Sequence, residues 1–202
     1  TATYDNPSNN FATINPLDNY YPAVTFSEGN NTIVTPASSI YAPTTCTMGL
    51  TAGKWYWELK PTTMSNNEQL TGIASTQTVV TSEELGHKPN DWAYYANNGY
   101  MRNNDSSSSY GDSYAVNDII GVALDITNSK LYFSKNGVWQ DSGDPTSGAS
   151  GTGAVSITAV ASTPYRAYFP AQTYWHSTSN TVSVNFGNGY FGTTAVSSAQ
   201  AD

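Results

Sequence analysis

Short strand-like segments recur about every 8 to 15 residues along this chain of 202 residues, and helical periodicity is nearly absent. The segments are rich in Val, Ile, Thr, Tyr and Phe, and clusters of Asn, Gly, Ser and Asp separate them. This spacing is typical of an antiparallel sandwich or barrel. The length suits one large all-β domain or two small ones, and we expect one.

Alternation along two segments indicates what the core contains. Between Lys54 and Lys60, the residues Trp55, Trp57 and Leu59 share one face, which we expect to be buried. The segment 119–126 is apolar on both faces until Asp125, so it should be a central, doubly covered strand. Phe133 and Phe169 are further expected core residues.

Turn and loop signals divide the chain. The sequences Asn97-Asn98-Gly99 and Asn136-Gly137 predict tight turns between strands. Segments 103–113, 141–153 and 82–91 are expected loops, the last with a helical turn. We expect an N-terminal arm at 1–22 that folds onto the domain, through Phe11, Tyr20 and Tyr21, a β-sandwich at 23–192 and an exit linker at 193–202.

The charge balance excludes some partners. Seven Lys and Arg stand against 15 Asp and Glu, so the formal net charge is −8. Non-specific nucleic-acid binding needs clustered cations, and an acidic membrane surface would repel this chain. The 13% of aromatic residues favours a folded domain over disorder.

Neither a leader nor a membrane span stands out in the sequence. No stretch approaches the roughly 18 apolar residues that a membrane helix needs. Because the chain begins at Thr1, we expect it to be a piece of a longer protein. The single cysteine, Cys46, lies in a strand-like segment and is expected to face the core.

Several motifs together resemble the SPRY domain, in that family's order. The motifs include Gly53-Lys-Trp-Tyr-Trp-Glu-Leu, Asp118-Ile-Ile-Gly-Val-Ala-Leu-Asp, Leu131-Tyr-Phe-Ser-Lys-Asn-Gly and Tyr165-Arg-Ala-Tyr-Phe-Pro-Ala. The resemblance spans about residues 44 to 187. The resemblance implies an all-β fold, a two-sheet antiparallel β-sandwich of lectin-like jelly-roll shape. It also implies binding and not catalysis.

The flanking segments resemble SPRY-type modules in structural proteins of tailed bacteriophages. These segments are Phe11-Ala-Thr-Ile-Asn-Pro-Leu-Asp, Thr25-Phe-Ser-Glu-Gly-Asn and Asn185-Phe-Gly-Asn-Gly-Tyr-Phe. Such proteins are usually tail fibres or adhesins. The resemblance therefore implies a virion-surface or extracellular location, with a host-surface glycan or protein and other virion subunits as partners, possible homo-oligomers of the parent fibre, and no nucleic acid or membrane insertion.

Aromatic residues near loops are the candidate ligand contacts. In several SPRY domains a peptide binds at a loop-built platform, and the resemblance carries Trp175 over to such a platform. Stacking faces with polar edges suit sugar rings or peptides. The candidate ligand-binding residues are Trp175, His176, Tyr174, Tyr94, Tyr95, Tyr100, Arg102 and Trp139, within a wider set of expected exposed aromatics that includes Tyr110 and Tyr114.

Catalytic and cofactor interpretations are poorly supported. His87 and His176 are the only imidazoles, and no nucleophile motif accompanies them. The segment 187–192 matches a dinucleotide fingerprint, but too little chain follows for the helix and strand that the motif requires. Asp141 and Asp144 offer oxygens to calcium without the spacing of a known loop. We therefore expect no enzyme and no cofactor.

Three functions remain to be compared. The first is a recognition module for a host-surface glycan or protein. The second is a structural decoration domain that packs on another virion subunit. The third is a polysaccharide hydrolase, which would need two carboxylates facing each other across a cleft.

Overall fold

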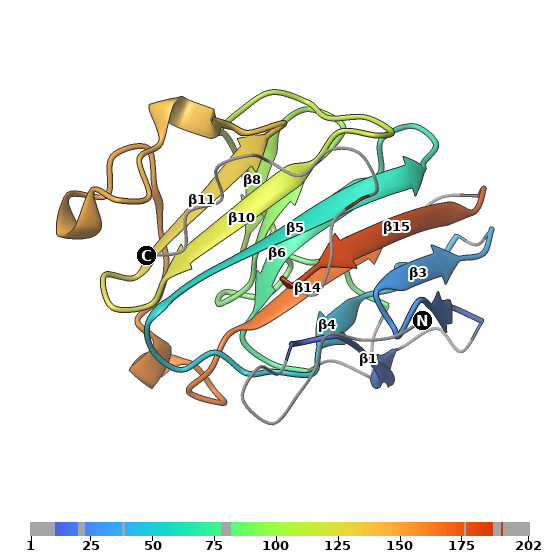
Figure 1. Cartoon of the computed structure of the whole chain (residues 1–202), viewed down its shortest axis with the longest axis horizontal. Coiled ribbons are helices and arrows are strands. Elements are labelled where there is room, and N and C mark those ends of the chain that lie inside the picture. Colours follow the sequence, from blue (N-terminus) through green and yellow to red (C-terminus); the bar gives the residue numbers. More distant parts are fainter. Residues whose placement is uncertain are drawn as a thin grey trace.

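The structure is a computed structural model, and it describes residues 11–19, 23–37, 39–77, 82–175, 177–187 and 191. Two antiparallel sheets stack face to face and form a sandwich, as the sequence predicts (Figure 1). None of the helices in these ranges is long and apolar enough to cross a membrane.

The first sheet has seven strands in a non-sequential order. In spatial order they are β1 (Ile14–Asn19), β4 (Thr44–Cys46), β14 (Phe169–Tyr174), β6 (Gln69–Ala74), β7 (Trp92–Tyr95), β8 (Tyr100–Asn103) and β9 (Ser106–Ser109). The expected N-terminal arm thus supplies an edge strand through residues 14–19, paired with β4. Its Tyr20 and Tyr21 lie outside the described residues.

The second sheet has eight strands and lies in front of the first in Figure 1. Its spatial order is β12 (Val138–Trp139), β11 (Lys130–Lys135), β10 (Ile120–Asp125), β5 (Lys54–Thr63), β15 (Asn180–Asn185), β3 (Thr32–Thr35) and β2 (Thr25–Ser27), with β13 (Val155–Ser156) paired to β11. The loops contain three short 3-10 helices, η1 (Gln140–Ser142), η2 (Gly148–Ser150) and η3 (Val160–Ser162).

The core lies between the sheets and follows the predicted alternation with one exception. Trp57 and Phe133 are buried there, and β10 is buried on both faces between β5 and β11. Phe169 is buried as well, but on the outward side of β14, opposite Ala74 of β6. Trp55 is 43% exposed, so its predicted place in the core is wrong. It stands near the beginning of β5, where its indole nitrogen turns back to donate a hydrogen bond to the Ala52 carbonyl at 2.7 Å.

The serine-rich loop departs from expectation as well. Residues Ser106–Ser109 form the edge strand β9, which pairs with β8 from Tyr100 to Asn103. All four serines of β9 are exposed, so backbone pairing and not side-chain packing holds the strand. Within 82–91 the chain turns at Leu85 and Gly86 and forms no helix.

Cys46 is fully buried on β4, as predicted. Its thiol donates to the Met48 carbonyl at 3.1 Å. Burial raises the pKa of this thiol to about 12, so it carries no thiolate at neutral pH. Cys46 is therefore an inert core residue.

Candidate binding surfaces

Two of the predicted ligand contacts lie in the core instead. Tyr94 and Tyr174 are fully buried, so their expected exposure is wrong, and Tyr114 is buried as well. Tyr94 alternates inward on β7 and packs on Phe133 with ring centroids 5.3 Å apart. The Tyr174 hydroxyl accepts a hydrogen bond from the Ser65 backbone nitrogen at 3.2 Å. The interior of this sandwich is wide enough to take whole tyrosine rings whose hydroxyls find backbone partners.

Arg102 and Tyr95 form the centre of a polar and aromatic network on the outward side of the seven-stranded sheet. The Arg102 guanidinium lies over the Tyr95 ring, 5.9 Å from its centroid. The same guanidinium forms an ion pair with Glu84 of the loop that crosses this sheet. The Tyr95 hydroxyl donates a hydrogen bond to Glu68. Both side chains are thus held in fixed positions at the surface.

Tyr41 links this centre to Trp175. The Tyr41 hydroxyl donates to Glu84 at 3.3 Å, and its ring packs on Trp175 with centroids 6.1 Å apart and planes inclined by 36°. Burial raises the pKa of Tyr41, so the hydroxyl keeps its proton and remains a donor. We call Tyr41, Glu68, Glu84, Tyr95, Arg102 and Trp175 the Arg102 network.

Tyr100 lies beside the Arg102 network. The register that pairs Ala93 with Arg102 and Tyr94 with Met101 brings Tyr100 opposite Tyr95 at the end of the β7–β8 hairpin. Tyr100 is 39% exposed and offers a ring to solvent. The structure therefore brings Tyr95, Tyr100, Arg102 and Trp175 to one surface, whereas His176 lies outside the described residues.

Trp139 lies on the other sheet, away from this network. It belongs to β12 and pairs with Ser134 of β11. Its ring packs edge-on against Tyr56 and Tyr132. The sequence placed Trp139 together with Trp175, but the strand order separates them because β12 is an edge of the eight-stranded sheet.

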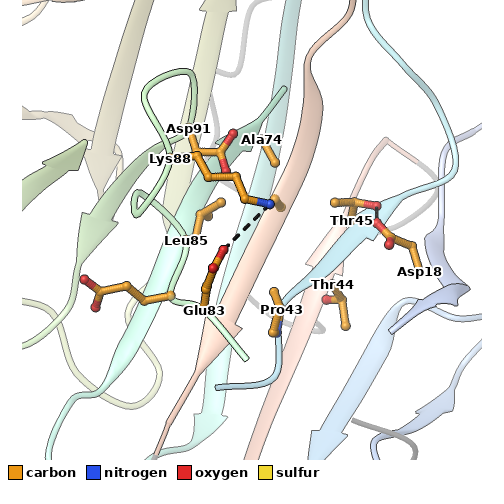
Figure 2. Close-up of a pocket in the computed structure, with 11 residues that line it drawn as sticks. Asp18, Pro43, Thr44, Thr45, Ala74, Glu83, Leu85, Lys88 and Asp91 are labelled. Atoms are coloured by element: carbon orange, nitrogen blue, oxygen red, sulfur yellow. Dashed lines mark hydrogen bonds and ion pairs between the residues drawn. The ribbon is translucent and has the colours of Figure 1, made fainter. Parts of the chain in front are cut away.

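An acidic pocket opens between the 82–91 loop and β4 (Figure 2). Its volume is about 20 Å³, room for one water-sized group. Asp18, Glu83, Glu84 and Asp91 line it together with Lys88, which pairs with Glu83 at 3.8 Å. Loss of water around Asp91 raises the pKa of its carboxyl, although hydrogen bonds from Ser75 oppose the shift.

Sequence reasoning missed Tyr41, Glu84 and Asp91. Glu84 lies in the loop sequence Ser82-Glu-Glu-Leu. Its neighbour Leu85 is the only apolar residue of that sequence, and this could have indicated that the loop packs on the domain. Leu85 packs on Ala74, Ala93 and Ala171 and so fixes the loop across the sheet. Tyr41 gave no signal, since nothing in its neighbourhood distinguishes it from a core tyrosine.

Asp141 and Asp144 show a turn geometry. Asp144 accepts hydrogen bonds from the backbone and the hydroxyl of Thr146, which lower the pKa of its carboxyl. Among the described residues, no three His, Cys, Asp or Glu side chains are grouped as metal ligands. The calcium prediction at these two residues stays a prediction.

Comparisons with known proteins identify the family. The SPRY domain family matches residues 54–188, about two thirds of the chain, and the protein belongs to this family. No curated protein sequence matches it significantly. SPRY domains are typically non-catalytic modules for protein interaction.

Solved structures share the fold at low sequence identity. The SPRY domain of human HERC1 has a TM-score of 0.67 and 14% identity, over 88% of this chain and 99% of that one. A human SPRY domain has a TM-score of 0.61 and 15% identity, over 83% and 97%. Stonustoxin has a TM-score of 0.58 and 18% identity, over 87% of this chain but only 27% of the toxin chain.

Proposed function

We propose that this chain is a non-catalytic recognition module of a virion or appendage protein, which binds a protein or glycan of the host surface through the Arg102 network and Tyr100. One observation carries the proposal: the Arg102 guanidinium contacts Tyr95 directly and is linked through Glu84 and Tyr41 to Trp175, so residues from distant segments meet at one surface. Interaction hot spots are enriched in Trp, Tyr and Arg, and this surface combines all three. The flanking phage-like segments support the virion context.

The side chains of the Arg102 network are held in place before a partner binds. Arg102 is positioned by Glu84 and Tyr95, and Trp175 is positioned by Tyr41, so little side-chain entropy is lost when a partner binds. The ring of Tyr100 is already exposed. Affinity per module is expected to be modest, and several copies on a fibre would raise it by multivalency.

The test is binding of the chain to candidate host cells and to a glycan array. Trp175→Ala and Arg102→Gln should each reduce binding by about tenfold or more, the loss expected when one hot-spot side chain is truncated. Tyr165→Ala is the matched control, because Tyr165 is an exposed aromatic residue, 57% accessible, that packs on Phe169 and touches none of the network.

The outcomes separate the recognition role from its main rival. If the chain binds neither cells nor glycans, the recognition proposal fails. If the chain instead binds purified virion particles, and Trp175→Ala abolishes this binding, the structural decoration role replaces the recognition role. Equal loss in Tyr165→Ala would show that the effect does not belong to the Arg102 network.

A further inference from the structure

The outward face of the eight-stranded sheet has an unusual composition. The four strands β5, β10, β11 and β15 are described in full, and none of their outward residues is Val, Leu, Ile, Met or Phe. Figure 1 looks onto this face. The outward residues are Lys54, Tyr56, Glu58, Lys60, Gly121, Ala123, Asp125, Lys130, Tyr132, Ser134, Thr181, Ser183 and Asn185. The core of a stable protein interface is mostly apolar, so this face is not composed like one.

One row of residues crosses five neighbouring strands of this face. The pairing brings Asn185 of β15 opposite Glu58 of β5, and Glu58 opposite Gly121 of β10. Gly121 in turn lies opposite Ser134 of β11, which faces Trp139 of β12. The row therefore runs from an amide through a carboxylate and a hydroxyl to an indole.

Tyr56 lies down across the centre of this row. A Cβ atom on Gly121 would come within 2.5 Å of the Tyr56 hydroxyl oxygen and 3.0 Å of its Cε2, so only glycine leaves room for the ring. Side chains in a sheet usually stand perpendicular to it. Tyr56 instead leans along the sheet over Gly121, and its side chain stays partly exposed.

Hydrogen bonds fix the ring in that orientation. The Tyr56 hydroxyl donates to Glu58 Oε1 at 3.0 Å, and Asn185 Nδ2 donates to Glu58 Oε2 at 3.2 Å. Burial and the charge of Glu58 raise the pKa of Tyr56, so its hydroxyl remains a donor. Trp139 packs edge-on against Tyr56, with centroids 6.2 Å apart and planes at 74°, and closes one side.

We propose that this Tyr56 surface is a carbohydrate site, which takes a neutral pyranose stacked on the Tyr56 ring beside Trp139. The face of a pyranose carries C–H bonds with partial positive charge, and they suit the negative face of an aromatic ring. Asn185 and Ser183 stand on the same outward side of β15 and can exchange hydrogen bonds with sugar hydroxyls. The net charge of −8 disfavours acidic sugars at long range.

The Tyr56 surface is independent of the function proposed for the Arg102 network. It shares no residue with that network and lies on the other sheet. The Tyr56 surface also differs from the Arg102 network in its position, because it lies in the middle of strands and not on loops. Backbone pairing within one sheet fixes where each residue of the row lies. A rigid element holds a site more accurately than a loop does.

The experiment is an NMR titration of the full chain with the methyl glycosides of glucose, galactose, mannose and N-acetylglucosamine. The backbone amides around Tyr56, Gly121, Ser134 and Trp139 should shift with at least one of them, with a Kd of the order of 1 mM. Tyr56→Ala and Trp139→Ala should weaken that binding about tenfold or more. Tyr56→Phe keeps the ring and should retain more affinity than Tyr56→Ala.

Two controls make the result decisive. Trp175→Ala should leave the glycoside-induced shifts of the amides around Tyr56 unchanged while it reduces binding through the Arg102 network, so the two proposals can fail separately. Thermal unfolding of each variant checks the fold, and Trp139→Ala at the sheet edge serves if Tyr56→Ala does not fold. The proposal is overturned if no glycoside shifts these amides, or if folded Trp139→Ala binds the glycoside as tightly as the unchanged chain does.

Discussion

The outward faces of the two sheets differ in composition and in what covers them. On the seven-stranded sheet the outward residues Leu70, Ala74, Ala93 and Ala171 are apolar, and the 82–91 loop covers them with Leu85. On the eight-stranded sheet the outward residues of the central strands are polar or aromatic, and they pair with one another across the row through Glu58. On one face a loop covers the centre of the sheet, and on the other the central side chains hydrogen-bond to one another.

The comparison shows where functional residues arise in this fold. On the seven-stranded sheet the covering loop brings Glu84 to Arg102, so that surface depends on a loop staying in place. On the eight-stranded sheet the site lies in mid-strand and depends on Gly121 leaving space for Tyr56. Variants of the loop anchor and of the glycine therefore test the comparison directly.

The largest expected effect is at the loop anchor. Leu85→Ala removes the side chain that packs on Ala74, Ala93 and Ala171, and it should lower the free energy of unfolding by about 2–5 kcal/mol. Urea denaturation measures the loss. Val138→Ala on the other sheet is the control, because Val138 is 67% exposed and its truncation should change stability by no more than about 0.5 kcal/mol. Similar losses in both variants would refute the anchoring role of Leu85.

A smaller effect is expected from filling the space above Gly121. In Gly121→Ala the new methyl group would lie 2.4 Å from Ser134 Oγ and 2.5 Å from the Tyr56 hydroxyl, so the Tyr56 ring must move. Overpacking of this kind costs about 1–3 kcal/mol. Denaturation and the near-ultraviolet circular dichroism of the aromatic rings would measure the two consequences.

The double variant Gly121→Ala with Tyr56→Ala separates the causes. If the collision with Tyr56 is responsible, the alanine at 121 costs less in the absence of the ring than in its presence. An equal cost in both backgrounds would show that the collision with Ser134 Oγ, and not with Tyr56, sets the cost, and Gly121 would then not be needed to make room for the ring.

Much of the fold could be predicted because alternation and turn chemistry are local. Asn136 and Gly137 adopt positive φ angles of 51° and 83°, as the predicted turn requires, and β11 and β12 pair on either side. The buried Trp57 and the central strand β10 followed from the same two-residue period. Trp55 failed because the period gives a face but not whether the facing sheet extends that far.

The candidate surfaces were harder to predict because they depend on which strands become neighbours. Trp139 and Trp175 are equally aromatic and near loops in the sequence, yet strand order assigns them to different sheets. Tyr94 and Tyr95 are adjacent, and only the pleat direction buries the first and exposes the ring of the second to Arg102. Pairing across distant segments, and not local composition, decides these roles.

The smallest expected effect concerns the pH dependence of the covered face. Desolvation raises the pKa of Asp91 above its ordinary value, so the native state binds this proton more tightly than the unfolded state does. The native state therefore loses stability relative to the unfolded state as pH rises through the native pKa of Asp91. Asp91→Asn removes this dependence and keeps an oxygen for the hydrogen bonds from Ser75.

Denaturation of the unchanged chain and of Asp91→Asn, followed from acidic to neutral pH, measures the difference. The free energy of unfolding of the variant, relative to that of the unchanged chain, should rise with pH across this range. Ser75→Ala is the companion variant, because loss of its hydroxyl removes one hydrogen bond that opposes the shift and should strengthen the pH dependence. A relative stability that falls with pH would mean that Lys88 outweighs desolvation, and the covered face would then hold its buried acid by charge pairing.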